Sequence, residues 1–511
     1  MAYIVVCIAT SWGSAHGGIN VINTGLARGA ANILPKGGRC ICVVEEALKT
    51  ATPLKVEVIS PSTFESDVVL EAVLKEVLKT PPPDIEGLLV IGHDLKTGQL
   101  AIDCAKDLQI RLGRDTSVKS AVISHMDYAE YSRRKGQSLP SVFEKSRRQH
   151  AVVSAADFAF AIGPLLADGF QKARRDRKDR VIALTPGSST IRAQAESNGA
   201  LKFYMSGRLG LEDDPIKNGV LAVRAVKAAY AAERSSATPG RWTLRGHFYA
   251  CGVDPEKDGE LIEMLKRDVR EDAAFELEPM PFTNQQEDLH DYLINADVAL
   301  MPSWHEGFGL AGWEALCAGV PLVCSTQSGL AILVGHLRDR FPDSDFDGVL
   351  SVVMTGGSPA GHPSDQDTNA LRDAIQRMVH EYPARKKAAM ELAPLIRQLF
   401  TWEGCAAELL ANAKWPWANP RDWFQRQLAA QRAVDSRDGA AGAEMMLTAL
   451  EACQSGHVER DWGQICSAMN FFSDVGATAT MRDRREFKTA LETIGNAISE
   501  ALATRVRLDL S

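Results

Sequence analysis

Residues 301–323 read MPSWHEGFGLAGWEALCAGVPLV and place two glutamates, Glu306 and Glu314, around a Gly-Phe-Gly turn between apolar runs. The apolar residues before the turn predict a buried strand. We expect a helix to begin near Leu310, because 3.6 residues per turn then put Glu314 a little over one turn inside it. The stretch therefore predicts a strand, a turn and a helix in immediate succession, which is the unit of an α/β fold.

The same turn has the features of a site for an anion and for hydroxyl groups. Gly307 and Gly309 permit close approach of the backbone to a ligand. Unpaired N–H groups at the helix start favour an anion such as a diphosphate. Glu314 can turn inward to accept hydrogen bonds from vicinal hydroxyls, and Glu306 is placed to meet a sugar. The competing interpretation is an ordinary strand-turn-helix with two surface glutamates.

The composition is that of an ordinary globular protein. The chain has 511 residues, of which 45% are hydrophobic and 24% are charged, so we expect two domains of roughly 150 to 250 residues. Lys and Arg number 57 against 65 Asp and Glu, a net charge of −8. This balance argues against a dedicated nucleic-acid binder and shows no strong nucleic-acid signal.

Cysteine usage and hydropathy predict a cytoplasmic protein without a membrane span. The ten cysteines include no CxxC pair, and we interpret Cys40 and Cys42 as thiols on a buried strand, in a reducing compartment. The N-terminus has no basic n-region and resembles a first strand, not a signal peptide. The apolar segment 151–170 is interrupted by Asp157 and Asp168, which excludes it as a membrane-spanning helix.

Short β-branched runs alternate with helical patterns, and this alternation predicts two successive parallel-sheet domains. We expect an N-terminal Rossmann-like domain over 1–185 and a second one over 186–400. A helix that crosses back, followed by a Trp/Pro linker, is expected over 401–421, and an all-helical extension over 422–511. The ligand should lie at the carboxyl ends of the strands, in a cleft between the two domains.

Residues 301–323 resemble the signature of retaining, family-4-like glycosyltransferases with the GT-B fold, which reads roughly PS-x-x-E-G-F-G-L-x-x-x-E-A-(x)-x-x-G-x-P-V. The resemblance covers about 1–414 and implies two Rossmann-like domains that face a cleft. It further implies that Glu306 contacts the transferred sugar and that Glu314 contacts the ribose hydroxyls of the nucleotide. The donor would lie against one segment of the motif: Glu306, Gly307, Phe308, Gly309 and Leu310.

Three further stretches resemble this family in the expected order. In FYMSGRLGLEDDPIKNGV the family's Arg and Lys, which clamp the donor diphosphate, match Arg208 and Lys217; two cations there would neutralise the charge on the leaving group. In SWGSAHGGINV the Gly17-Gly18 pair matches a loop that approaches the phosphates. In KSAVISHMDYAEY the residue His125 matches a histidine that meets the donor sugar.

The resemblance implies a nucleotide-sugar donor such as a UDP-, GDP- or ADP-sugar, transfer with retention, and no further cofactor. Catalytic roles fall to His125, Glu306, Arg208 and Lys217. We expect no metal site, and we interpret Asp343-Ser344-Asp345 as a solvated loop.

Two alternatives of other classes remain open at this point. The chain could be a nucleotide-sensing or partner-recruiting module of a multi-protein defence or signalling system, with a protein partner or a second copy bound through 422–511. It could also be a nucleotide-sugar hydrolase or a phosphorylase. The base, the sugar and the acceptor are not specified by these motifs.

Overall fold

In the computed structural model the described part of the chain runs from residue 2 to residue 413, with internal gaps at 14–16, 47–54, 115, 176, 178, 190, 194–200, 208, 210–213, 235–245, 254–258, 260–262, 264–265, 267–274, 281–282, 284–285, 343 and 355–363. The extension expected over 422–511 lies outside the described residues. So do the linker from 414 onward and the predicted diphosphate ligand Arg208.

The first domain is built on one parallel sheet. Among the described residues its strand order is β3-β2-β1-β4-β5-β6-β7. The bounds are β1 Ala2–Ser11, β2 Arg39–Glu46, β3 Val56–Ile59, β4 Ile85–His93, β5 Ser117–Ser124, β6 Phe158–Ile162 and β7 Ile182–Leu184. The central strand β1 is buried along almost its whole length, because helices cover both faces of a parallel sheet and its strands are therefore continuous apolar runs.

The second domain repeats this arrangement. Its described strands lie in the order β10-β9-β8-β11-β12-β13, all parallel. The bounds are β8 Lys202–Ser206, β9 Gly246–Cys251, β10 Phe275–Met280, β11 Val298–Met301, β12 Leu322–Ser325 and β13 Val349–Val352. The two sheets confirm the predicted α/β class with two Rossmann-like domains.

Helices connect the strands and cover the sheets. In the first domain they are α1 Gly18–Ile33, α2 Ser66–Val77, α3 Asp94–Leu112, α4 Tyr128–Arg134, α5 Leu139–Ala155 and α6 Pro164–Phe170, with 3₁₀ turns at Pro82–Asp84 and Gln171–Arg174. After β7 they are α7 Asp214–Lys217, α8 Gly219–Arg234, α10 Gln286–Ile294, α11 Leu310–Ala318, α12 Gly329–Arg340, α13 Asp365–His380, α14 Tyr382–Leu399 and α15 Trp402–Asn412. No helix in the described ranges combines the length and apolar character that crossing a bilayer requires.

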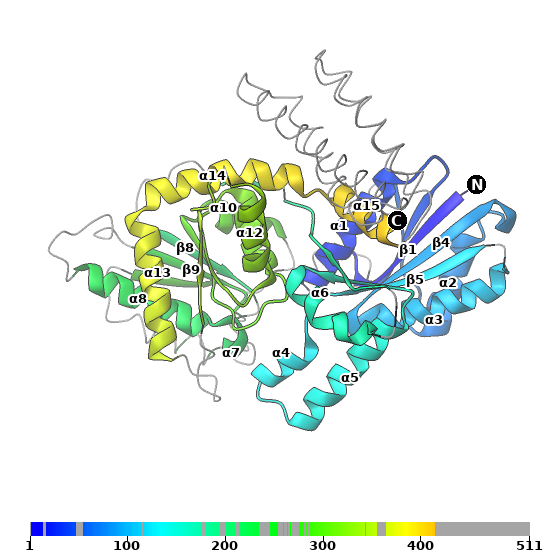
Figure 1. The fold of residues 1–511 in the computed structure, drawn as a ribbon, viewed down its shortest axis with the longest axis horizontal. Coiled ribbons are helices and arrows are strands. Elements are labelled where there is room, and N and C mark those ends of the chain that lie inside the picture. Colours follow the sequence, from blue (N-terminus) through cyan, green and yellow to red (C-terminus); the bar gives the residue numbers. More distant parts are fainter. Residues whose placement is uncertain are drawn as a thin grey trace, which may run out of the picture.

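Each sheet has one place where the strand order reverses. The chain steps from one side of β1 to β4 on the other side, and likewise from one side of β8 to β11. Loops that leave the carboxyl ends of strands at such a point diverge and leave a crevice, where open α/β sheets bind ligands. The two sheets stand side by side in Figure 1, and α6 of the first domain contacts α12 of the second.

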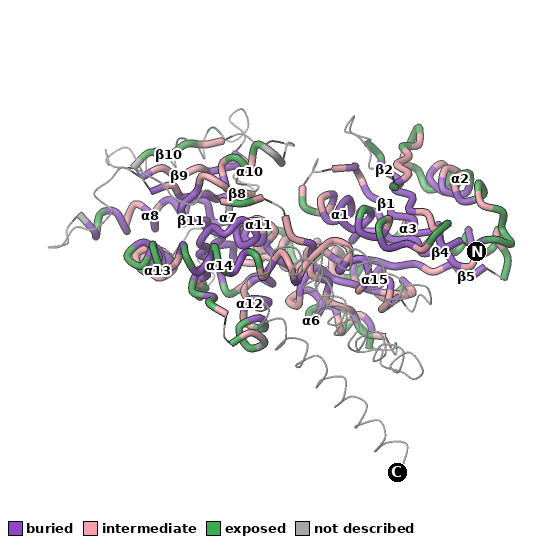
Figure 2. Tube along the Cα trace, turned by 90° about the horizontal axis from the view of Figure 1, so that it is seen from above, coloured by how far each residue is buried: buried purple, intermediate pink, exposed green. Residues whose placement is uncertain are grey.

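The core of each domain lies between its sheet and its helices, and Figure 2 shows the central strands, such as β1 and β4, as buried. Cys40 and Cys42 both lie buried in β2. Every cysteine that the structure describes is a free, buried thiol, as predicted.

The chain returns to the first domain after α14. Helix α15 packs on α1, and Figure 1 shows the two helices side by side. A Cβ added at Gly25 would lie 2.3 Å from the ring of Trp402, and one at Gly187 would lie 2.5 Å from it, so only glycine leaves room for this indole. The N–H of Ser188 donates to the carbonyl of Phe400 at 2.7 Å, which ties together the two crossings between the domains.

Replacing Trp402 with alanine should therefore destabilise the whole two-domain body. We expect W402A to lose about 3 kcal/mol of unfolding free energy, because the backbone that surrounds the indole cannot collapse around a methyl group. The measurement is urea unfolding followed by fluorescence and circular dichroism. The control is M390A on α14, where the side chain is 40% exposed and a change within about 0.5 kcal/mol is expected. Equal stability of W402A and M390A would contradict this role of Trp402.

Candidate functional site

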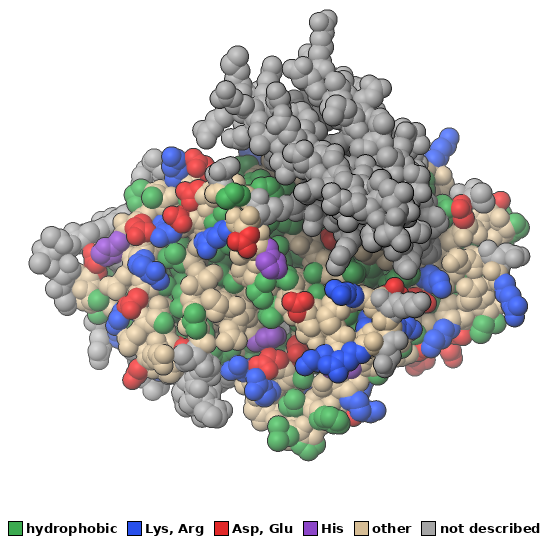
Figure 3. Space-filling view, viewed as in Figure 1, with side chains coloured by type: hydrophobic (Ala, Val, Ile, Leu, Met, Phe, Trp, Pro, Cys, Tyr) green, Lys and Arg blue, Asp and Glu red, His purple; other side chains and the backbone are tan. Residues whose placement is uncertain are grey.

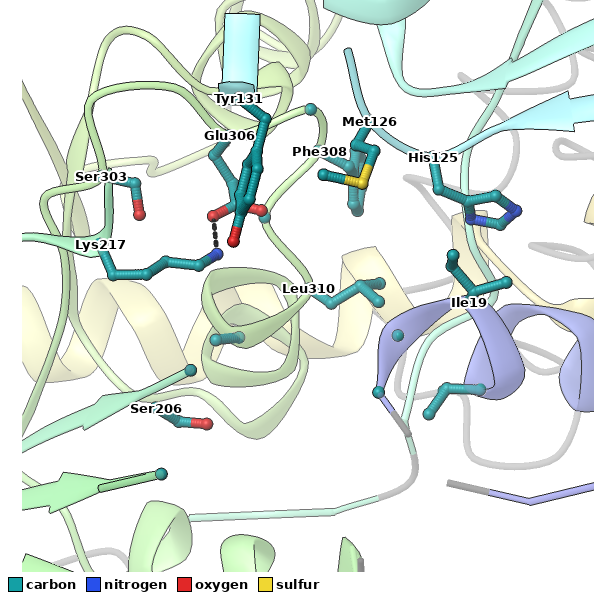
Figure 4. A pocket seen from close by; sticks show the side chains of 18 of the residues that line it. Ile19, His125, Met126, Tyr131, Ser206, Lys217, Ser303, Glu306, Phe308 and Leu310 are labelled. Carbon is teal, nitrogen blue, oxygen red and sulfur yellow. Dashed lines mark hydrogen bonds and ion pairs between the residues drawn. The ribbon is translucent and has the colours of Figure 1, made fainter. Parts of the chain in front are cut away.

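One cleft between the two domains collects the loops that leave the carboxyl ends of the strands. Its volume is about 870 Å³. The first domain contributes the start of α1 and the segment after β5, and the second contributes the ends of β8 and β11 with the start of α11. In Figure 4, Ile19 and His125 lie on one side of this cleft, and Lys217 and Glu306 lie on the other.

Every site residue predicted from the sequence that the structure describes lines this cleft. These residues are Gly17, Gly18, His125, Lys217, Glu306, Gly307, Phe308, Gly309, Leu310 and Glu314. They come from both domains and from segments nearly 300 positions apart along the chain. The structure thus brings the predicted set together, while the role of each residue toward a ligand stays a prediction.

The turn that carries Glu306 is held by the loop after β12. The N–H of Glu306 donates to the carbonyl of Gln327 at 3.1 Å, and the carbonyl of Glu306 accepts from the N–H of Gly329 at 3.1 Å. A further bond runs from the N–H of Leu330 to the carbonyl of Phe308 at 2.8 Å. These backbone bonds fix the turn from behind and leave the Glu306 side chain at the cleft.

Helix α11 begins at Leu310, as predicted, and its N-terminus is uncapped by any side chain. The residue before it, Gly309, has a left-handed backbone with φ 107, which glycine adopts without a steric penalty. The first N–H groups and the positive end of the helix dipole therefore remain available to an anion. Glu314, one turn into the helix, also lines the cleft.

The glycine at 307 is required by a contact between the domains. A Cβ there would lie 2.8 Å from the carbonyl oxygen of His125 and 2.8 Å from the side chain of Leu166, both in the first domain. Across the same junction, a Cβ at Gly18 would lie 2.6 Å from the side chain of Leu310. The sequence suggested that Gly307 and Gly18 leave space for a ligand. In the structure, atoms of the opposite domain fill the space beside both glycines.

Lys217 and Glu306 form an ion pair at the cleft, with 2.5 Å between Nζ and Oε2. Their side chains are 21% and 20% exposed, so water reaches the pair only partly. Figure 4 draws this contact, with the Tyr131 side chain from α4 pointing toward it. The pair holds a cation beside the start of α11 and keeps it neutralised by a carboxylate.

His125 belongs to a chain of polar side chains that reaches from the cleft into the core of the first domain, and the other members of this chain were not among the predicted site residues. Its Nε2 lies 2.8 Å from Nδ1 of His93, and Nε2 of His93 lies 2.9 Å from the amide oxygen of Asn23. His93 ends β4, and His125 follows β5. These strands are parallel neighbours, so their carboxyl ends bring the two imidazoles together.

Asn23 determines where the protons of this chain lie. Its amide nitrogen donates to Sγ of Cys42 at 3.2 Å, so the amide oxygen faces His93 and can only accept. His93 therefore donates from Nε2 and accepts at Nδ1 from the Nε2–H of His125, which keeps its own Nδ1 as an acceptor. Burial lowers the pKa of His93 to about 3. Burial, together with His93, lowers the pKa of His125 well below its ordinary value, so both rings are neutral at pH 7.

Asp94 positions the backbone of His125. Its carboxylate accepts the N–H of His125 at 3.0 Å and the side-chain amide of Gln149 at 3.1 Å. Burial raises the pKa of Asp94 to about 8, and these two donors act in the opposite direction. Asp94 also has φ 46, a left-handed backbone that is uncommon outside glycine. This strained turn supports the segment whose carbonyl meets Gly307.

The sequence contained one signal for these residues. The run LLVIGHD ends a strand with a histidine, as KSAVISH does, and adjacent parallel strands place such ends together. Asp127, two residues after His125, caps α4 by accepting from the N–H groups of Ala129 and Glu130.

No three His, Cys, Asp or Glu side chains within the described ranges are grouped so as to hold a metal ion. Asp343 of the predicted solvated loop lies outside those ranges.

Comparison with known families gives one match that spans most of the chain. The model described as "Family 4 Glycosyltransferase in conflict systems" matches residues 6–409. A GDP-mannose-dependent alpha-(1-6)-phosphatidylinositol dimannoside mannosyltransferase of Mycobacterium tuberculosis is 30% identical over 26% of this chain. A D-inositol 3-phosphate glycosyltransferase of Corynebacterium urealyticum is 27% identical over 46% of this chain. The matched regions span 29% and 50% of the lengths of these two curated relatives.

Solved structures share the fold at low sequence identity. Sucrose-phosphate synthase of Thermosynechococcus elongatus superposes with a TM-score of 0.53 at 18% identity, over 80% of this chain and 97% of that one. Anabaena Alr3699/HepE, solved with UDP and glucose, superposes with a TM-score of 0.52 at 12% identity, over 80% of this chain and 98% of that one. These similarities establish the two-domain GT-B fold that the sequence predicted.

The contact at Gly307 predicts that G307A is destabilised. The added methyl would meet backbone and side-chain atoms of the first domain, and we expect a loss of about 2 kcal/mol from overpacking. The control is G335A, in α12, where a Cβ meets nothing within 4 Å and the better helix propensity of alanine should stabilise by about 0.5–1 kcal/mol. Thermal and urea unfolding measure both. The interpretation fails if the two variants change stability in the same direction.

The buried imidazoles predict a loss of stability in acid. His93 has a pKa near 3 in the fold and near 6.5 when unfolded. The unfolded chain therefore binds the extra proton between these values, and the contribution of His93 to stability falls as pH decreases through that window, whereas the contribution of Asp94, whose pKa is raised to about 8 in the fold, has the opposite sign. At pH 5 the loss from His93 amounts to about 2 kcal/mol relative to pH 7.

H93Q should therefore be less stable than wild type at pH 7 but lose less stability between pH 7 and pH 5, as measured by urea unfolding. Asp94 is present in both chains and largely cancels in the comparison. H336Q removes an exposed imidazole on α12 and is the matched control. If H93Q and wild type lost equal stability over this range, His93 would not be buried as a neutral ring.

Proposed function

The chain belongs to the family 4 glycosyltransferases of conflict systems, and on that premise we propose that it transfers a sugar from a nucleotide-sugar donor to an acceptor with retention of configuration. The donor binds mainly to the second domain and the acceptor binds to the first. The domains close around both, because an open site would favour hydrolysis of the donor.

The observation that carries this proposal is the convergence of four features on one cleft. Glu306 and Glu314 flank the uncapped start of α11, Lys217 lies against Glu306, and His125 faces them from the first domain. An isolated pair of glutamates would not need a cation and a helix N-terminus beside it. A sugar diphosphate has hydroxyls that donate to the two carboxylates and negative charge that suits Lys217 and the N-terminus of α11.

In the proposed complex the diphosphate lies against Lys217 and the N–H groups at the start of α11. Lys217 then moves from Glu306 to a phosphate oxygen, so the donor replaces an internal partner with its own charge. Arg208 supplies the second cation in this proposal. These groups stabilise the charge that develops on the leaving diphosphate. In other enzymes, removal of one hydrogen-bond donor of this kind lowers the rate by about 10²–10³-fold.

The release of Glu306 from Lys217 frees its carboxylate to accept from hydroxyls of the transferred sugar. Glu314 accepts from the ribose of the nucleotide. The neutral His125 accepts a hydrogen bond at Nδ1 from a further hydroxyl of the sugar. All three contacts orient the anomeric carbon toward the acceptor side of the cleft.

Retention follows if the acceptor attacks from the face that the leaving group vacates. The departing β-phosphate oxygen lies on that face and takes the proton of the attacking hydroxyl, through an ion-pair-like transition state. Lys217, Arg208 and the helix N-terminus supply the positive charge in this mechanism, so we propose that the reaction needs no metal ion. We also propose that the protein is cytoplasmic and that residues 422–511 bind a protein partner or a second copy of the chain.

The donor class can be tested by thermal shift against UDP-, GDP-, ADP- and TDP-sugars. GDP-mannose belongs first in the series, since one relative is named for it. We expect one donor to raise the melting temperature by mass action and K217A to abolish most of that shift. With the acceptor, K217A should lower turnover about 10²-fold. The control K387A removes a lysine on α14 that is 75% exposed and should leave both measurements unchanged.

Two results would overturn the proposal. One is the absence of any stabilising nucleotide sugar. The other is a K217A variant that turns over saturating donor at the wild-type rate. A product with inverted configuration, read by NMR at the anomeric position, or loss of activity with a chelator would overturn the retaining or the metal-free part separately. Donor breakdown that is faster without any acceptor would favour a hydrolase.

A further inference from the structure

Helices α4 and α5 form a hairpin that projects from the first domain, away from its sheet, as Figure 1 shows. The inner side of this hairpin belongs to the cleft, which Tyr131, Lys135 and Lys145 help to line. Its outer side is exposed and has no role in the site described above.

The outer face of α5 begins with two exposed apolar side chains. Leu139 is 77% exposed and Phe143 is 70% exposed. They are four positions apart and lie one above the other on the helix surface, and the next residue of this stripe is the exposed Arg147. A helix on the surface of a globular domain normally carries polar residues on its outer face. Exposed apolar side chains at this position therefore indicate a surface that binds an apolar partner.

The same hairpin is a basic part of an acidic protein. Residues 128–150 contain six Lys and Arg against two Glu, a net charge of +4, whereas the whole chain has a net charge of −8. Arg133 and Arg134 share the carboxylate of Glu130, and Arg147 pairs with Glu144. Lys135 and Lys145 line the cleft, and the outer side of α5 carries the exposed Arg147 and Arg148 against one exposed carboxylate, that of Glu144, which leaves positive charge beside the apolar stripe. At the lower tip of Figure 3 hydrophobic side chains lie on the surface with Lys and Arg beside them.

Hydrogen bonds inside the hairpin hold this face in place. Nζ of Lys145 donates to the hydroxyl of Ser132 at 3.0 Å and to the side chain of Gln137 at 2.7 Å, which joins α5 to α4 and to the loop between them. The side-chain amide of Gln149 donates to the carbonyl of Met126 at 2.7 Å. The apolar stripe is therefore already ordered, and a partner need not bear the entropy cost of folding it.

We propose that the outer face of the α4–α5 hairpin docks the protein on the surface of an anionic lipid bilayer. Leu139 and Phe143 would enter the region just below the head groups, where interfacial helices bury their apolar residues. Arg147 and Arg148 would lie at the head groups, since long cationic side chains keep their charge in water while their stems cover apolar surface. Each cation near an acidic leaflet adds to the attraction.

A nucleic acid fits this face less well. It would use the cations, and a single strand would stack on the ring of Phe143, but it gains little from the equally exposed Leu139 beside that ring. The bilayer uses both properties of the surface. Docking in this orientation would also bring the acceptor side of the cleft, lined by the same hairpin, next to the membrane. The inference goes beyond the proposed function and does not depend on it.

The test is sedimentation of the full chain with vesicles of phosphatidylcholine alone and of equal parts phosphatidylcholine and phosphatidylglycerol. We expect binding only to the acidic vesicles, and weaker binding as salt is raised. The double variant L139S/F143S and the double variant R147Q/R148Q should each weaken binding about tenfold. The control I110S replaces an apolar side chain on α3 that is 78% exposed and should bind like wild type.

Unfolding midpoints close to wild type would show that the variants are folded, as expected for exposed positions. Three results would overturn the inference. The first is no binding of wild type to acidic vesicles. The second is equal weakening by I110S. The third is binding to a DNA or RNA oligonucleotide that R147Q/R148Q reduces and L139S/F143S does not, without vesicle binding, which would identify the hairpin as a nucleic-acid surface.

Discussion

The site depends on the contact between Gly307 and the carbonyl of His125. Here the turn after β11 in one domain meets the segment after β5 in the other, and a single Cβ would lie within 2.8 Å of that carbonyl. The contact joins two carboxyl-end loops, one from each sheet, which otherwise would face each other across open solvent. Both sides of the contact are held by hydrogen bonds, from His125 to Asp94 and from the Glu306 turn to the β12–α12 loop.

The charges of the cleft are balanced before any ligand binds. Lys217 is matched by Glu306, and the two histidines of the first domain are neutral because burial disfavours their charged forms. A ligand therefore meets no free buried charge among these groups, which would be costly to maintain. In the proposed complex an anion replaces the Glu306 carboxylate as the partner of Lys217. Such exchange selects for ligands that bring both negative charge and hydroxyl groups.

Local patterns were enough to predict the elements but not how the site residues contact one another. The helix start expected near Leu310 is confirmed, since it directly follows the Gly-Phe-Gly turn. The Gly307 contact and the His93–His125 pair join residues from different strands or domains, and no local spacing encodes them. Of the predicted site, Arg208 is outside the described residues, and the ligand roles remain predictions.

The seat of Trp402 has a mechanical consequence. The chain passes between the domains at Gly187 and Ser188 and again at Phe400, and a hydrogen bond joins these two crossings beside the indole. Because these two connecting segments are bonded to each other at one point, they act as a single hinge between the domains. A rotation of one domain against the other about this point would leave the packing around the indole nearly unchanged and would move most those cleft residues that lie farthest from it.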